Sequence, residues 1–261
     1  MMFKPMNTPV RDWSGQRIWL IGASSGIGAA LAQQALEQGA RVALSARREE
    51  VLQQVAGKHP NALIVPLDVL DHAAWRRTYE DICDAFGGID LLLFCAADYR
   101  PERSWQVSDA GAEKTLRTNL LSVYSALATV LPAMLASHTG GIALVASVAG
   151  YIGLPNASVY GPAKAALINL AEILYSDLHD KGINVYLINP GFVKTDLTAQ
   201  NTFAMPALQT PEAAAQAIWR GIARGRFEIH FPQRFTRFLK LLQMLPYRWR
   251  FALFQRFLDV K

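Results

Sequence analysis

Short apolar runs alternate with longer amphipathic stretches along most of the chain, and this alternation is the feature that most constrains its fold. The apolar runs fall at 17–21, 41–46, 61–66, 89–95, 141–146, 183–188 and 227–231. Strands that alternate with helix-length segments form βαβ units, whose crossover connections make neighbouring strands parallel. The pattern therefore predicts an α/β fold, with one parallel sheet wound on both faces by helices.

The segments between these runs predict helices and one long loop. We expect a first helix from the turn after the first apolar run to about 38, and further helices at 73–86, 110–137, 158–181 and 211–223. The third of these is expected to bend or stop near Pro132, because proline removes a helical hydrogen bond. Residues 192–210 have no steady period and predict a binding or lid loop. Two short helices, separated by Pro246, are expected at 235–244 and 247–258.

Length and composition favour one domain, with a core of about 14–231 and a helical extension at 232–261. A hydrophobic content of 51% with 18% charged residues excludes a disordered chain. The two cysteines make no disulfide framework, and the N-terminus has no apolar stretch of signal-peptide length. No segment has the uninterrupted apolar length of a membrane span. We therefore expect a cytoplasmic protein.

Three glycines lie between the first strand and the first helix, in the sequence GASSGIG. Gly22 lets the chain turn, Gly26 leaves room for a phosphate beside the backbone, and Gly28 lets the helix approach the strand. An ordinary tight turn needs fewer glycines. The turn therefore predicts a Rossmann-type dinucleotide site at the helix N-terminus. Its further cofactor contacts are expected from Ser24, Ser25 and Ile27.

The end of the second strand predicts which dinucleotide binds. A carboxylate at this point would bind the ribose 2′-hydroxyl of NAD. The chain instead has Arg47 and Arg48, with no carboxylate before Glu49. Two guanidinium groups suit a 2′-phosphate, so NADP (NADPH) is favoured and NAD is less favoured. The alternative is that both arginines form the solvated start of the next helix.

Ser147, Tyr160 and Lys164 supply the chemistry that a hydride carrier needs. Tyr160 and Lys164 are four residues apart on one predicted helix and therefore share a face. A nearby ammonium and an oxidised nicotinamide ring would favour the phenolate over a phenol of pKa ~10. Tyr160 would then exchange a proton with a carbonyl or alcohol oxygen to which Ser147 hydrogen-bonds. The alternative, a surface tyrosine whose hydroxyl reaches water, is disfavoured by the glycine turn upstream.

With the glycine turn, these residues make the chain resemble the short-chain dehydrogenase/reductase family in its soluble form. The resemblance runs from about 14 to 195, and more loosely to 231. It implies carbonyl–alcohol interconversion with hydride transfer at the B face of the nicotinamide. It also implies that Asn119 joins the catalytic group and holds a water linking Lys164 to solvent. The further cofactor contacts that it implies are Asp68, Val69, Cys95, Ala96, Ala97, Tyr160, Lys164, Pro190, Gly191, Val193 and Thr195.

The chain departs from the family pattern before the glycine turn and after the fourth strand. Ile21 replaces a threonine, and Phe94-Cys95-Ala96-Ala97 replaces Asn-Asn-Ala-Gly. These changes bear on local bracing and on the backbone near the cofactor ribose. Cys95 is expected to be a buried core cysteine rather than a reactive thiol. The five histidines show no ligand spacing, so no metal site is predicted.

The expected substrate contacts are apolar. Tyr151 follows Ser147, and Phe203 and Met205 lie in the 192–210 loop. An apolar lining favours a hydrophobic aldehyde, ketone or alcohol, although such loops can also be apolar for packing. The neighbouring positions of the same character are Ile152, Leu154, Pro155 and Pro206.

The C-terminal extension is basic, whereas the rest of the chain is nearly neutral. Residues 226–261 contain eight Lys or Arg against Glu228 and Asp259. Aromatic and aliphatic residues interleave with these charges, which fits peripheral contact with a membrane surface. The alternatives are a cap over the substrate pocket or an oligomer interface. No nucleic-acid partner is expected, and the resemblance implies a homo-oligomer, a dimer or a tetramer.

These features together predict an NADP(H)-dependent oxidoreductase that interconverts a carbonyl and an alcohol on a hydrophobic, lipid-derived substrate. The alternative from another class is a catalytically silent cofactor-binding scaffold or sensor at a membrane surface. Such a scaffold would have no reason to keep all four catalytic positions.

Overall fold

A computed structural model describes residues 4–201, 203 and 205–257. Its centre is a seven-stranded sheet in the order β3-β2-β1-β4-β5-β6-β7, and all six neighbouring pairs are parallel. The predicted doubly wound fold is confirmed. The strands coincide closely with the apolar runs: β1 Arg17–Ile21, β2 Arg41–Ser45, β3 Ala62–Ile64, β4 Leu91–Phe94, β5 Gly140–Val145, β6 Ile183–Pro190 and β7 Glu228–Phe231.

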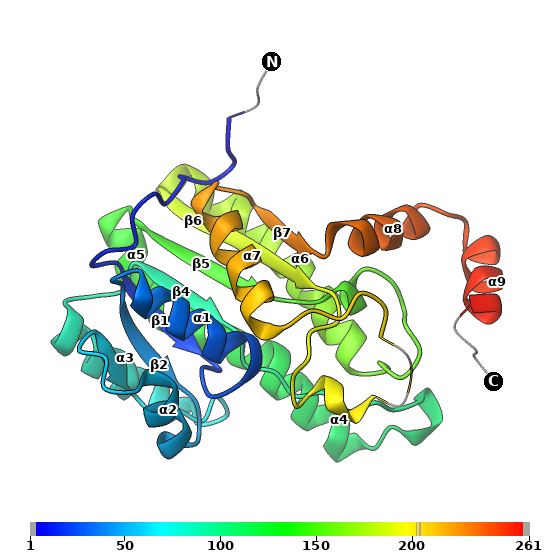
Figure 1. The fold of residues 1–261 in the computed structure, drawn as a ribbon, viewed down its shortest axis with the longest axis horizontal. Helices are drawn as coiled ribbons and strands as arrows, with labels where there is room; N and C mark the ends of the chain where they lie inside the picture. The colour runs from blue at the N-terminus through cyan, green and yellow to red at the C-terminus, as the bar shows by residue number, and fades with distance from the viewer. Residues whose placement is uncertain (1–3, 202, 204, 258–261) are drawn as a thin grey trace.

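Helices cover both faces of the sheet (Figure 1). One hydrophobic core joins the sheet to α1 (Gly26–Glu37), α2 (Glu49–Ala56) and α7 (Pro211–Ala223). A second core on the opposite face joins it to α3 (His72–Phe86), α5 (Ser122–Ser137) and α6 (Tyr160–Leu178). Burial on both faces explains why the strand sequences are continuously apolar rather than alternating.

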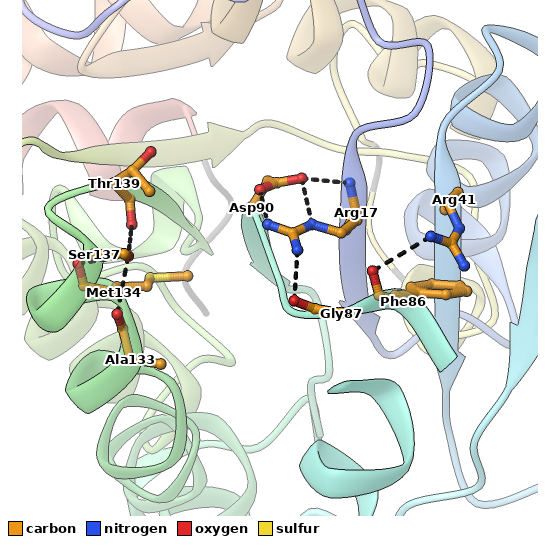
Figure 2. Close-up of polar contacts among 9 residues, drawn as sticks. All are labelled: Arg17, Arg41, Phe86, Gly87, Asp90, Ala133, Met134, Ser137 and Thr139. Carbon is orange, nitrogen blue, oxygen red and sulfur yellow. Dashed lines mark hydrogen bonds and ion pairs between the residues drawn. The ribbon is translucent and has the colours of Figure 1, made fainter. Parts of the chain in front are cut away.

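The amino-terminal edge of the sheet is held by ionic contacts (Figure 2). Arg17 Nε donates to Asp90 Oδ2 over 2.9 Å, and its Nη1 donates to the Gly87 carbonyl over 2.7 Å. Burial raises the pKa of the Asp90 carboxyl, but its hydrogen bonds with Arg17 outweigh this and leave the pKa lowered. Arg41 lies over the Phe86 ring, 4.4 Å from its centroid. These contacts fix β1, β2 and β4 at the edge opposite the glycine turn.

The stretch expected as one helix at 110–137 is helical from Asp109 to Ser137, but its irregularity lies elsewhere than predicted. It consists of α4 (Asp109–Leu116), a π-helical turn at Arg117–Leu121 and α5. Pro132 lies inside α5. The π turn inserts an extra residue per turn and directs Asn119 into the interior, where it is fully buried.

The same stretch is the one helical segment, within the described residues, that is long and apolar enough to cross a membrane. The core helix of a globular domain has the same length and composition. Val123, Ala126, Val130 and Met134 of α5 are buried against the sheet. Packing beneath the sheet therefore accounts for their apolar character.

The C-terminal extension forms α8 (Gln233–Gln243) and α9 (Tyr247–Phe257). Figure 1 shows both helices beyond the carboxyl end of β7, at the margin of the molecule. Two helices separated by Pro246 were expected here, and α8 begins two residues earlier than predicted. Leu258, the predicted end of the second helix, lies outside the described residues.

Candidate active site

The glycine turn after β1 is tightly packed. Gly22 has φ +87°, and a Cβ there would lie 2.5 Å from the Ala96 nitrogen at the end of β4. Gly26 has φ +55°, and a Cβ would lie 2.7 Å from Thr195 Cγ2. A Cβ on Gly28 would lie 2.0 Å from the Gly22 carbonyl oxygen. Each glycine therefore has a steric reason to be present, because backbone or side-chain atoms occupy the space of a Cβ.

Gly28→Ala should damage this turn. The methyl group would collide with backbone atoms, which cannot move aside without reshaping the strand–helix connection. We expect a loss of unfolding free energy of about 1–3 kcal/mol, together with weaker cofactor binding. Thermal unfolding and cofactor titration measure the two effects.

Gly153→Ala is the matched control, because a Cβ at Gly153 meets nothing within 4 Å. Equal melting temperatures for wild type and Gly28→Ala would contradict the packing derived for the turn.

Almost all the expected cofactor-binding residues line one cleft of about 420 Å³ at the carboxyl edge of the sheet. Only Gly28, which shapes the turn from behind, is not part of its lining. The cleft lies at the ends of β1 and β4, where the strand order reverses and α/β folds bind their ligands. Residues from turns far apart in sequence are thus brought to one surface.

Arg47 and Arg48 line the cleft beside Asp68. Both arginines are exposed, and within the described part of the chain neither side chain makes a hydrogen bond or ion pair. Their guanidinium groups therefore remain available to an anionic ligand. Arg48 is also the N-cap residue of α2, but it makes no side-chain capping bond.

Ser147, Tyr160 and Lys164 also meet in this cleft. Ser147 follows β5, and its Oγ accepts a hydrogen bond from the Ala149 nitrogen over 3.1 Å. Tyr160 opens α6, and Lys164 lies one turn further along. Lys164 Nζ donates to the Val145 carbonyl over 2.9 Å and lies 5.4 Å from the centroid of the Tyr160 ring. The predicted shared helix face is therefore present.

Burial is the largest influence on the pKa values of Tyr160 and Lys164. It raises the pKa of the Tyr160 phenol above its ordinary value, while a hydrogen bond with Ser147 opposes the rise. Burial lowers the pKa of the Lys164 ammonium to about 8. The expected shift toward the phenolate involves an oxidised nicotinamide ring as well as the ammonium, so it stays a prediction for the cofactor complex. In the protein alone, burial keeps Tyr160 as the neutral phenol, which is the state a proton donor requires.

The lowered pKa of Lys164 should appear in the pH dependence of stability. The unfolded chain keeps this proton up to about pH 10.5, whereas the folded protein releases it near pH 8. Between these values the unfolded state binds more protons, so the free energy of unfolding should rise with pH by about 3 kcal/mol. Denaturant unfolding at pH 7–10 tests this. The rise should be absent in Lys164→Met, and an identical slope in both proteins would contradict it.

Asn119 lies on the π turn, which packs against α6, the helix that carries Tyr160 and Lys164. Its Nδ2 donates to the Asp98 carbonyl over 2.7 Å and to the Thr115 carbonyl over 2.9 Å. Its buried Oδ1 has no hydrogen-bond partner among the described residues. An acceptor left open in this way suits the water that the resemblance implies, because buried polar atoms are nearly always paired.

Cys95 lies at the end of β4, in the cleft lining. Burial raises the pKa of its thiol to about 11, although the Lys164 charge acts in the opposite direction. A thiol with this pKa is protonated at neutral pH and is a weak nucleophile. Cys95 is half-buried and not part of the fully buried core, because it lines the cleft, but its thiol has the environment of an inert cysteine.

The three residues expected to contact the substrate lie outside the cleft lining. Tyr151 is buried, and its hydroxyl donates to Glu228 Oε1 over 2.6 Å, so this side chain faces β7 and α8 instead of the cleft. Phe203 contacts the Phe192 ring, with centroids 5.9 Å apart, and Met205 accepts from Asn201 Nδ2. None of the three predicted residues lines the cleft. The position of Tyr151 differs from the prediction because α8 occupies the space beside it.

A residue without any sequence signal packs on Tyr160. The Tyr99 ring packs edge-on against the Tyr160 ring, with centroids 5.0 Å apart. The Tyr99 hydroxyl donates to Asn201 Oδ1 over 2.8 Å, which ties the 192–210 loop to the wall of the site. Tyr99 belongs to no recognisable motif, and only its position after β4 could have pointed to it.

A parallel α/β sheet with a glycine turn and a Ser–Tyr–Lys group at its carboxyl edge defines a class: oxidoreductases that interconvert carbonyl and alcohol groups. A model of the short chain dehydrogenase family matches residues 16–205. The chain belongs to this family.

The matches to known proteins cover most of this chain and most of each relative. An uncharacterised oxidoreductase of Myxococcus xanthus is 32% identical over 229 residues, which cover 86% of this chain and 90% of the relative. The 3-oxoacyl-(acyl-carrier-protein) reductase FabG of Escherichia coli is 32% identical over 190 residues, 72% of this chain and 77% of FabG. A short-chain dehydrogenase structure from Streptomyces avermitilis has a TM-score of 0.82 at 22% identity, covering 93% of this chain and 97% of that one.

Proposed function

We propose that this protein is an NADP(H)-dependent reductase of a hydrophobic, lipid-derived aldehyde or ketone. The observation that carries the proposal is the convergence of Ser147, Tyr160 and Lys164 on the cleft that the glycine turn also lines. Relatives bearing the name of a 3-oxoacyl reductase, and a Burkholderia phymatum family structure in complex with NAD, support a nicotinamide cofactor and carbonyl chemistry.

The residues present fit such a cofactor. Gly22 and Gly26 line the cleft without a Cβ, and the α1 N-terminus offers free amides to a pyrophosphate. Arg47 and Arg48 would hold a 2′-phosphate by charge-assisted hydrogen bonds. When bound, the cofactor supplies the hydride.

The protein supplies the proton and the orientation. Tyr160, held as a neutral phenol, donates its proton to the carbonyl oxygen of the substrate as negative charge develops there. Ser147 hydrogen-bonds the same oxygen and fixes its position. The Lys164 ammonium lies close enough to the Tyr160 ring to stabilise the phenolate that proton donation leaves behind.

Aromatic side chains beside Tyr160 support the apolar substrate. Tyr99 packs on Tyr160, and the Phe192–Phe203 pair lies in the loop that Tyr99 ties down. Cofactor preference and substrate class can be tested together by measuring NADPH and NADH oxidation with aldehydes, ketones and 3-oxoacyl thioesters of increasing chain length.

We expect kcat/KM to rise with chain length and to be higher with NADPH. A protein that binds cofactor but turns over no member of the panel would favour the silent scaffold. A preference for short, polar carbonyls would contradict the apolar site.

A further inference from the structure

The outer face of the C-terminal helices exposes large apolar side chains. Six of them, all between 238 and 251, are 54–82% exposed in the described structure: Phe238, Leu241, Met244, Tyr247, Trp249 and Phe251. Phe238 and Leu241 of α8 and Met244, which follows its last residue, recur at intervals of three, so they lie on one side of the helix. A contiguous set of this kind, unlike a single exposed leucine, marks an interaction surface.

Basic residues border these side chains, and acidic residues are absent from the same segment. Residues 229–257 contain six Lys or Arg and no Asp or Glu. Arg234 and Arg237 are exposed on the outer face of α8. Lys240 is already paired with Glu228, so it is not counted as part of the free charge of this face.

The inner face of α8 is already occupied. Thr236, Leu239 and Leu242 are buried, and both leucines pack in a cluster with Tyr151 and Ile152. Lys240 of α8 pairs with Glu228 of β7, whose Oε1 also accepts from Tyr151 and from Asn189 of β6, and this network anchors α8 to the sheet. Packing against the domain therefore explains the apolar residues on the inner face of α8. The outer face has no partner within the described structure.

We propose that the outer face of α8 and α9 docks on the surface of an anionic lipid bilayer. Exposed aromatic and aliphatic residues would enter the headgroup region, while Arg234, Arg237 and Arg248 would meet lipid phosphates. A second copy of the chain fits less well, because a two-fold interface would place this acid-free basic surface against itself.

Docking on this face would place the active site beside the lipid. The outer and inner faces belong to the same helix, and the inner face packs on Val148, one residue after Ser147. The α8 helix also starts at the carboxyl end of β7, the edge of the sheet that carries the cleft. A membrane-dissolved carbonyl compound would thus have a short path to Tyr160. This last consequence rests on the proposed function, whereas membrane docking does not.

Co-sedimentation of the full-length protein with vesicles tests the docking without substrate or cofactor. We expect binding to vesicles that contain phosphatidylglycerol, and little binding to phosphatidylcholine alone. Binding should weaken strongly at about 1 M salt, where the screening length falls to about 3 Å. Failure of wild-type protein to bind the anionic vesicles overturns the proposal.

Substitutions on the outer face of α8 test whether this face is the one that binds the vesicles. Replacing Arg234 and Arg237 with glutamine should weaken binding by about 30-fold, since each basic residue near such a surface contributes about 5-fold. Leu241→Glu with Met244→Glu should abolish it. The matched controls are Arg77→Gln and Met6→Glu, exposed residues on other elements, which should bind like wild type.

Circular dichroism and melting temperature confirm that each variant is folded. Equal binding by the tail variants and the wild type would overturn the proposal. So would a wild-type dimer that leaves vesicles unbound and dissociates in Leu241→Glu, which would identify a second copy as the occupant.

Discussion

Tyr160→Phe is expected to lower kcat for carbonyl reduction by about 10³-fold or more, while the cofactor still binds nearly as in the wild type. The substitution removes one hydroxyl and leaves the ring in contact with Tyr99 and Lys164. Cys95 is a poor substitute as proton donor because burial raises the pKa of its thiol to about 11. The Lys164 ammonium instead donates to the Val145 carbonyl. Steady-state kinetics and cofactor titration separate the two effects.

Tyr175→Phe is the matched control. It removes a hydroxyl that donates to the Met6 carbonyl over 2.8 Å, at the outer side of α6 and outside the cleft lining. We expect unchanged kcat and, at most, a loss of about 1 kcal/mol in stability. Turnover by Tyr160→Phe within a few-fold of the wild type would show that the proton comes from another group.

Arg47→Ala is expected to raise the KM for NADPH by about 10- to 100-fold, since a charge-assisted hydrogen bond contributes about 1.5–3 kcal/mol. The KM for NADH should change little, because NADH has no 2′-phosphate for the guanidinium group to bind. Arg47 lines the cleft and makes no side-chain bond in the described structure, so its removal should leave the fold intact.

Arg77→Ala serves as the control for loss of a positive charge, because Arg77 is exposed on α3 and outside the cleft lining. It should leave both KM values unchanged. Equal increases in the KM for NADPH and NADH in Arg47→Ala would remove the basis for the NADP assignment.

Much of the cofactor side of the site could be predicted because its signals are local. Gly22, Gly26 and Gly28 follow a strand directly and are recognised by their spacing. A Cβ at Gly28 would collide within the turn itself, whereas a Cβ at Gly22 or Gly26 would meet Ala96 or Thr195 from distant parts of the chain. Tyr160 and Lys164 share a face because the α-helical repeat places residues four apart on one side. The substrate side had no such signal. Tyr99 reaches Tyr160 across the site, from a loop 61 positions earlier in the chain.

Local sequence patterns were enough to predict the succession of strands and helices along the chain, the glycine turn and the residues able to carry the chemistry. Each depends on periodicity or on spacing within a few residues. Three properties became visible only in the folded chain: the π turn at Arg117–Leu121, the position of Tyr151 beneath α8, and the burial that raises the pKa of Tyr160. These properties arise from contacts between segments far apart in the chain, and from the loss of water around them, which no local pattern encodes.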